Sequence, residues 1–176
     1  MMHITFIGGG NMAQALIGGL IARGLPATRI TVSDPVEKVR LMLAEKDVHV
    51  TDDNAAAIRD ADIVVFAVKP QVFAGILKPL KGQLEGKLVI SIVAGAEIST
   101  IASILETGRI VRVMPNTPAL IGQGMTGLFA RPGVSAAERT LVEQVVATTG
   151  AHLWVEEEAL LDAVTALSGS GPAYVF

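Results

Sequence analysis

The sequence predicts an α/β fold in which a doubly wound, mostly parallel β-sheet carries helices on both faces. Short apolar runs alternate along the chain with segments of helical period, as in successive strand–helix–strand units. Of the 176 residues, 51% are hydrophobic and only 18% are charged, a composition that suits strands buried on both faces. A glycine-rich turn at residues 8–10 joins the first strand to the first helix, which is also typical of such folds.

Each strand of the predicted sheet is an apolar run, rich in Val and Ile, that ends at a turn residue. The clearest run, IVVFAV, ends at Lys69 and Pro70. The strands are expected at residues 3–7, 30–33, 48–50, 63–68, 88–93 and 110–114.

The helices between these strands have apolar residues three or four positions apart and recognisable ends. The first helix begins at the glycine turn and is stopped by Gly24 and Pro26. A short helix is capped by the polar segment 52–54 and ends near Asp60. Further helices are expected at 36–46, 72–80 and 98–105.

The last third of the chain departs from this simple alternation. Ser135 and Glu138 form a capping-box pattern, and three glutamates from Glu156 open the final helix at the positive end of its dipole. The elements expected here are strands at 125–129 and 152–155 and helices at 136–149 and 156–167.

The segment Ser168-Gly169-Ser170-Gly171-Pro172 breaks the last helix, and the chain ends on apolar residues that begin another. We therefore expect one domain over residues 1–155. Residues 156–176 are expected to form a connecting helix and the start of a second domain of a longer protein.

The glycine turn carries the dinucleotide-binding pattern Gly8-x-Gly10-x-x-Ala13 in the required place, between a strand and a helix. Gly8 permits a tight turn, Gly10 leaves no Cβ between the backbone and a pyrophosphate, and Ala13 lets the helix lie close to the strand. The helix N-terminus then presents N–H groups to the phosphates. The alternative is a glycine turn that only tightens the corner between strand and helix and binds no ligand. The P-loop, the other common phosphate-binding pattern, is absent from the sequence.

The residues that follow each strand are candidate ligand contacts, because ligands of open α/β sheets bind at the carboxyl ends of the strands. Small, polar or backbone-exposing residues recur there, although each alone is ordinary turn chemistry. Lys69 is the one basic residue at the end of a strong strand, and it is either a solvated turn lysine or a functional group.

Asp34 leaves the identity of the dinucleotide open. It follows the second strand near the spacing, roughly 20 residues past the glycines, at which an acid binds the ribose 2′-hydroxyl of NAD. An NADP site would instead place hydroxyl or cationic groups there, and Ser33, Lys38 and Arg40 are near.

The composition argues against several other classes of protein. The chain has no cysteine, which excludes disulfides and thiol catalysis, and no metal-ligand spacing is found, so no metal is expected. A net charge of −3 without a basic cluster argues against nucleic-acid binding. No apolar run reaches the roughly 18 residues of a membrane span, and no signal peptide is recognised, so a cytoplasmic protein without a membrane partner is expected.

No catalytic triad or closely spaced pair of carboxylates is recognisable. The histidines, His3, His49 and His152, are far apart and are interpreted as surface or strand-end residues.

Five segments, taken together and in this order, resemble the pyrroline-5-carboxylate reductases: FIGGGNMAQALIGGL, VVFAVKPQ, VISIVAGAEISTI, VRVMPNTPALIGQGMTGL and DAVTALSGSGPAYVF. The resemblance spans essentially the whole chain and implies a Rossmann-type domain. It also implies NAD(P)H-dependent reduction of the cyclic imine 1-pyrroline-5-carboxylate to L-proline, the last step of proline biosynthesis. The expected cofactor is NADP(H), with NAD(H) as the alternative.

The resemblance further implies which residues contact the cofactor. These residues are Ile7, Gly8, Gly9, Gly10, Asn11, Met12, Ser33, Asn54, Ala67, Val68, Lys69, Pro70, Val93, Ala94 and Gly95. We add Asp34 as a further candidate cofactor contact because of its spacing from the glycines.

A second, all-helical domain is implied as well, one that forms a homodimer or higher homo-oligomer and supplies much of the substrate pocket. Because its Gly-Gly-x-Thr segment is not in this chain, we expect the chain alone to be weakly active or inactive. Asn116, Thr117 and Glu158 are the candidate near-substrate residues. A protonated imine is already electrophilic, so no acid–base pair is required.

Three other functions remain open. The first is a 3-hydroxyacid dehydrogenase of the 6-phosphogluconate type, which needs a base for the hydroxyl proton. The second is a non-catalytic module that senses NAD(P). The third is a plain structural or interaction domain, which would bind no dinucleotide.

Overall fold

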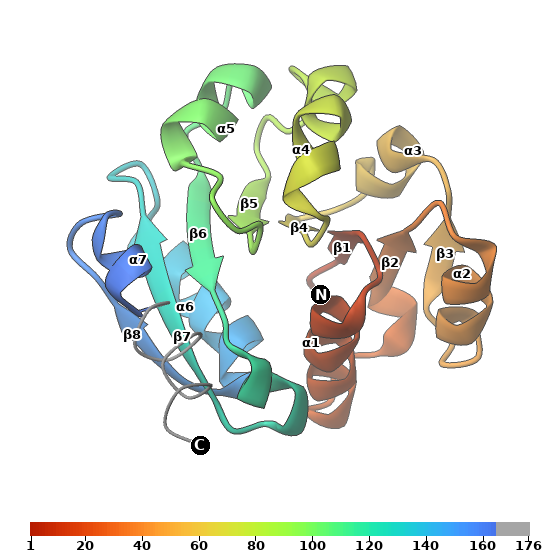
Figure 1. Ribbon diagram of the computed structural model, residues 1–176. Helices are drawn as coiled ribbons and strands as arrows, with labels where there is room; N and C mark the ends of the chain where they lie inside the picture. The colour runs from red at the N-terminus through yellow and green to blue at the C-terminus, as the bar shows by residue number, and fades with distance from the viewer. Residues whose placement is uncertain (165–176) are drawn as a thin grey trace.

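Eight strands form one sheet within residues 1–164, the part of the chain that the computed structural model describes. Their order is β3-β2-β1-β4-β5-β6-β7-β8, and all neighbours are parallel except β6 and β7 (Figure 1). The predicted doubly wound, mostly parallel sheet is confirmed. The strands are β1 Ile4–Ile7, β2 Ile30–Ser33, β3 His49–Thr51, β4 Ile63–Phe66, β5 Leu88–Ser91, β6 Ile110–Met114, β7 Gly124–Ala130 and β8 Gly150–Trp154.

Helices cover both faces of this sheet. In Figure 1 the face with α3, α4 and α5 lies above the strands, and the face with α1 and α6 lies below. The helices are α1 Asn11–Ala22, α2 Glu37–Ala44, α3 Asn54–Ile58, α4 Pro70–Leu77, α5 Ile98–Leu105, α6 Ala136–Val146 and α7 Leu160–Val164. Short 3-10 turns are η1 Ala27–Arg29, η2 Lys78–Leu80, η3 Thr117–Ile121 and η4 Ala147–Thr149.

Two hydrophobic cores lie on the opposite faces of the sheet, because successive strand residues point to opposite sides. Phe6 packs in the core between the sheet and helices α1 and α6. Its neighbour Ile7 packs in the core between the sheet and helices α4 and α5. Strands β1, β4, β5 and β6 are buried along their whole lengths. Burial on both faces explains why they appear in the sequence as nearly continuous apolar runs.

Some element boundaries differ from the predicted ones. The strands expected at 63–68 and 88–93 end at Phe66 and Ser91. The residues beyond these points are apolar but belong to turns at the carboxyl edge, because hydrophobicity reports burial and not strand geometry. The helix expected at 136–149 is α6 followed by the 3-10 turn η4.

The prediction that the last helix opens at Glu156 is wrong. Residues 156–159 form a turn, and α7 begins at Leu160. The side chain of Glu158 instead accepts hydrogen bonds from α5 and β6, so tertiary contacts outweigh the local preference of glutamate for a first helical turn. The predicted helix break at 168–172 lies outside the described residues.

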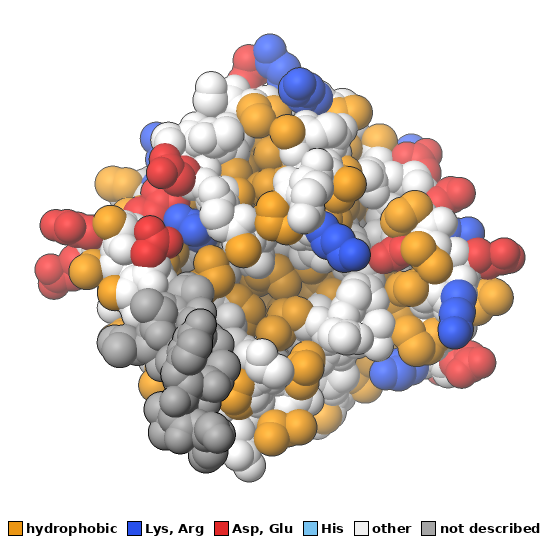
Figure 2. Space-filling view, in the orientation of Figure 1, with side chains coloured by type: hydrophobic (Ala, Val, Ile, Leu, Met, Phe, Trp, Pro, Cys, Tyr) orange, Lys and Arg blue, Asp and Glu red, His pale blue; other side chains and the backbone are white. Residues whose placement is uncertain are grey.

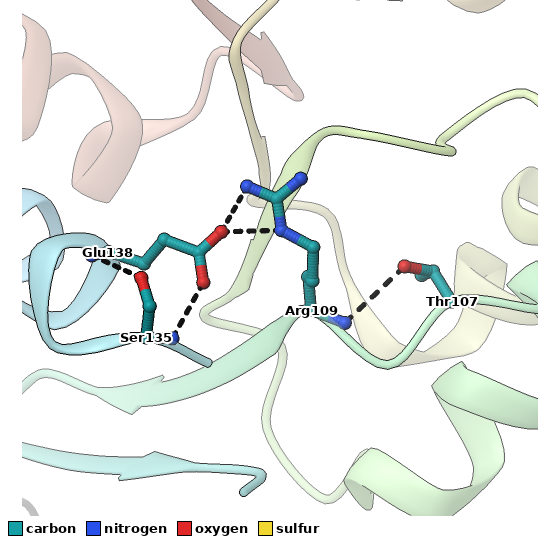
Figure 3. A network of polar contacts seen from close by, with 4 residues as sticks. All are labelled: Thr107, Arg109, Ser135 and Glu138. Atoms are coloured by element: carbon teal, nitrogen blue, oxygen red, sulfur yellow. Dashed lines mark hydrogen bonds and ion pairs between the residues drawn. The ribbon is translucent and has the colours of Figure 1, made fainter. Parts of the chain in front are cut away.

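The predicted capping box at the start of α6 is confirmed, and it is tied to the sheet (Figure 3). Ser135 Oγ accepts from the N–H of Glu138, and the Glu138 carboxylate accepts from the N–H of Ser135 at 2.8 Å and pairs with Arg109. Burial is the largest influence on the pKa of Glu138 and raises it, but the hydrogen bonds from Ser135 and Arg109 and the charge of Arg109 together hold that pKa below its ordinary value. Because Arg109 immediately precedes β6, the Arg109–Glu138 ion pair connects the start of α6 to the amino edge of the sheet.

Among residues 1–164, no helix is both long and apolar enough to cross a bilayer. Within the same part of the chain, no group of His, Asp and Glu side chains is arranged to hold a metal ion.

Candidate dinucleotide-binding site

The order of the strands reverses its direction at β1 and β4. From β1 the chain moves to β2 on one side, and it later returns to β4 on the other side. In open α/β sheets this reversal of direction is where ligands bind. The register aligns Ile7 with both Ser33 and Phe66, and Phe66 with Ser91. The residues that follow β1, β2, β4 and β5 therefore meet at one edge.

Gly8 closes the corner between β1 and β4. Its φ is +100°, and a Cβ on this residue would lie 2.4 Å from the carbonyl oxygen of Ala67. Backbone hydrogen bonds hold Gly8 and Ala67 in place. The N–H of Gly8 donates to the carbonyl oxygen of Ser33, and the N–H of Ala67 donates to the carbonyl oxygen of Ile7, each at 2.8 Å. Only glycine fits this close approach.

Gly9 is fixed by packing and by a hydrogen bond. A Cβ on Gly9 would lie 2.8 Å from Val39 Cγ1 and 3.0 Å from Leu43 Cδ1, both in α2. Its N–H donates to Asp34 Oδ2 at 2.8 Å, and its carbonyl accepts from Gln14 Nε2 at 2.7 Å. Gly9 therefore faces the protein interior and holds the turn in its shape.

Gly10 faces open space. It is exposed, and a Cβ built on it would have no heavy atom within 4 Å. It precedes α1, which has no side-chain cap; α2, α4 and α5 also lack one, whereas α3 and α6 are capped by Asp53 and Ser135. The first N–H groups of α1 thus lack a capping side chain at an open corner, an arrangement that suits a phosphate group.

The end of β2 forms a second polar cluster. The Ser33 hydroxyl, which is buried, donates to Asn54 Oδ1 at 2.6 Å. Asp34 accepts from Gly9 N–H through one carboxylate oxygen and from Val36 N–H through the other, each at 2.8 Å. Arg40 Nη1 donates to the carbonyl of Asp34 at 2.8 Å. The Ser33 hydroxyl, the Asn54 amide and the Arg40 guanidinium therefore lie close together here, while the Asp34 carboxylate accepts hydrogen bonds from backbone N–H groups.

The turns after β4 and β5 complete the edge. Lys69 is the exposed N-cap residue of α4, with Pro70 as the first helical residue. Val93 is buried, whereas Ala94 and Gly95 are exposed, and Gly95 has a φ of +72°. Figure 2 shows hydrophobic side chains gathered across the middle of this view, with Asp and Glu side chains toward its margins. The structure thus brings the expected cofactor contacts to one edge of the sheet; their contact with a cofactor stays a prediction.

The three candidate near-substrate residues differ in their surroundings. Asn116 is buried and accepts a hydrogen bond from Met125 N–H at 3.0 Å. Thr117 is exposed at the start of η3, which packs against α1. Glu158 is joined to Arg112 and to the N–H of Ile98. Sequence reasoning missed Arg112, although a charged residue within the apolar run IVRVM was a visible signal.

His3 and His49 lie away from this edge, and His152, predicted as a surface or strand-end residue, is half-buried in the middle of β8. His3 precedes β1 and therefore lies at the opposite, amino edge, where its Nε2 is 2.9 Å from Thr31 Oγ1. Burial, and then the nearby His49 and Arg29, lowers the pKa of His3. His49 is exposed at the first position of β3.

Comparison with known proteins shows the family. Residues 3–95 match the family described as "NADP oxidoreductase coenzyme F420-dependent". The chain is 46% identical over 180 residues to the pyrroline-5-carboxylate reductase of Haemophilus influenzae, a match that covers 100% of this chain. It superimposes on a pyrroline-5-carboxylate reductase from Coxiella burnetii with a TM-score of 0.95 at 40% identity, over 99% of this chain. The chain belongs to the pyrroline-5-carboxylate reductase family.

Another member of the family has been solved with a bound dinucleotide. The Plasmodium falciparum pyrroline carboxylate reductase, with NADP bound, matches with a TM-score of 0.86 at 30% identity, covering 99% of this chain and 64% of that one. The chain spans 66% of the length of both the H. influenzae and the C. burnetii members.

Proposed function

We propose that this chain supplies the dinucleotide-binding part of an NADPH-dependent reductase that converts 1-pyrroline-5-carboxylate to L-proline. The observation that carries the proposal is the open, uncapped start of α1 at Gly10, located at the point where the strand order reverses. Family membership supports the substrate. The proposal includes a cytoplasmic homo-oligomer that assembles through a helical domain following residue 155.

In this reaction the main task of the chain is to bind the cofactor and to orient it toward the substrate. The cofactor, when bound, supplies the hydride that the imine carbon accepts, while the ring nitrogen keeps a proton and becomes the amine. The backbone at Gly10 and the first turn of α1 would hold the pyrophosphate. The turns at 67–70 and 93–95 would hold the nicotinamide half over the imine. Correct positioning of two reactants lowers a barrier by several kcal/mol without an acid–base pair.

Cofactor binding and turnover are tested separately. We expect the 176-residue chain to bind NADPH in a calorimetric titration and to oxidise it slowly with 1-pyrroline-5-carboxylate. A polypeptide of the length of the H. influenzae relative should turn over rapidly. Absence of NADPH binding contradicts the proposal. Binding by the longer protein without turnover of the imine favours a sensing module, and turnover of a 3-hydroxyacid instead favours the dehydrogenase.

NADP(H) is favoured over NAD(H) by the cluster at the end of β2. Both carboxylate oxygens of Asp34 accept backbone N–H groups, which leaves this acid poorly placed to bind a ribose diol. The Arg40 guanidinium and the Ser33–Asn54 pair lie beside it, and guanidinium groups bind phosphates well. We infer that these residues surround the 2′-phosphate of NADP.

The variant Arg40→Gln is expected to raise the Kd for NADPH about tenfold and to leave the Kd for NADH within about twofold, since one charge-assisted phosphate contact is lost. Titration of both cofactors measures this. Lys46→Gln removes the same charge from an exposed position just beyond the C-terminal end of α2 and serves as the control, with less than about a twofold effect expected. Equal losses for both cofactors with Arg40→Gln contradict a 2′-phosphate contact.

A further inference from the structure

An ion pair between a buried arginine and a half-buried glutamate connects the segment after β8 to the loop that enters α5. Arg112, in the middle of β6, is only 4% exposed. Its Nη1 donates to Glu158 Oε1 at 3.1 Å, and the same oxygen accepts from the backbone N–H of Ile98 at 2.8 Å. Among residues 1–164 the Nε of Arg112 has no hydrogen-bond partner, so this guanidinium depends strongly on Glu158.

Ile98 is the point at which the loop 92–97 ends. The loop begins beside Arg112, because Ser91 is aligned with Arg112 in the sheet, and there the N–H of Ile92 donates to Phe66 at 3.0 Å. At its far end the N-cap residue of α5, Glu97, makes no side-chain capping bond. The Glu158 carboxylate supplies that acceptor from a distant part of the chain, and a negative charge is favourable at a helix N-terminus.

We propose that Glu158 is a positioning residue for the cofactor, which acts by holding the loop 92–97 through the N–H of Ile98. The exposed residues Ala94 and Gly95 lie within this loop, and the inference rests on the proposed function in taking them as cofactor contacts. Glu158 Oε1 is occupied by two donors from the protein itself. In this proposal the side chain acts on cofactor binding through the backbone of the loop.

Two neutral double variants isolate the hydrogen bond from the charge. Arg112→Met with Glu158→Gln removes both charges but keeps an amide oxygen for Ile98. Arg112→Met with Glu158→Met removes the charges and the acceptor. Replacement of a buried ion pair by apolar residues of similar volume is often tolerated, and Leu at both positions provides a second version of the acceptor-free variant.

NADPH binding is expected to discriminate between these variants. The glutamine variant should bind within about twofold of the original chain, and the methionine variant about fivefold more weakly, as loss of one buried hydrogen bond implies. Equal Kd values for the two variants overturn the proposal.

The Arg109–Glu138 pair provides a control, because it is another arginine–glutamate pair but lies at the amino edge of the sheet, with a half-buried Arg109 side chain (Figure 3). Arg109→Met with Glu138→Met should lower stability and leave the Kd for NADPH within about twofold, since it contacts no part of the loop. A loss of affinity equal to that of the Arg112 and Glu158 variant shows a general effect of stability and also overturns the proposal.

Amide hydrogen exchange without cofactor separates this inference from the proposed function. The amides of residues 94–98 should exchange about tenfold faster in the acceptor-free variant than in the glutamine variant, because the loop loses its anchor. Unchanged exchange rejects the role of Glu158. Faster exchange in a chain that fails to bind NADPH supports the anchor and rejects the proposed function.

Discussion

Replacement of Gly10 with valine is expected to raise the Kd for NADPH about 100-fold while changing the free energy of unfolding by no more than about 1 kcal/mol. The valine side chain would occupy the open space in which a Cβ meets no atom within 4 Å. The backbone there is extended, with a φ of −71° and a ψ of −172°, so valine fits without strain. The added methyl groups would instead hold the pyrophosphate away from the first turn of α1. Calorimetric titration and thermal unfolding measure the two effects.

Gly18 provides the control for this substitution. It lies in the same helix, and a Cβ there also meets nothing within 4 Å. Gly18→Ala should leave the Kd unchanged and stabilise the fold by about 0.5–1 kcal/mol, because alanine is the better helix former. Unaltered NADPH affinity in Gly10→Val would show that the phosphates bind elsewhere.

Replacement of Gly8 with alanine is expected to lower the free energy of unfolding by about 3–5 kcal/mol. The new Cβ would lie 2.4 Å from the Ala67 carbonyl oxygen, and alanine is strained at a φ of +100°. The backbone cannot easily move apart here, because Ala67 is hydrogen-bonded to Ile7 and Gly8 is hydrogen-bonded to Ser33. Denaturant unfolding measures the loss. Gly10→Ala, two residues away, should cost no more than about 1 kcal/mol, and a similarly small cost for Gly8→Ala would contradict the close approach of β1 and β4.

The fold could be predicted from the sequence because its main signals are local. Buried strands have mostly apolar residues and end at turn residues, so the predicted ranges 30–33 and 110–114 agree with β2 and β6. The capping box at Ser135 depends on residues three positions apart. The corner at Gly8 to Gly10 was recognisable because one motif combines a strand, a turn and a helix.

The parts that sequence reasoning could not supply depend on distant contacts. The direction of Asp34 is set by the N–H of Gly9, which comes from a different turn. The start of α7 is delayed because Glu158 bonds to Ile98 and Arg112, in two other elements. Gly9 and Gly10 look alike in the sequence, yet one packs against α2 and the other faces solvent.

The missing side-chain cap of α1 has a thermodynamic consequence. Among residues 1–164, no side chain caps this helix at Gly10, so under the proposed function the cofactor supplies the acceptor that the helix lacks. Occupancy and folding are then linked: a ligand present at 100 times its Kd stabilises the native state by about 2.7 kcal/mol. A cell that is rich in NADPH would therefore also hold more of this protein in its native form.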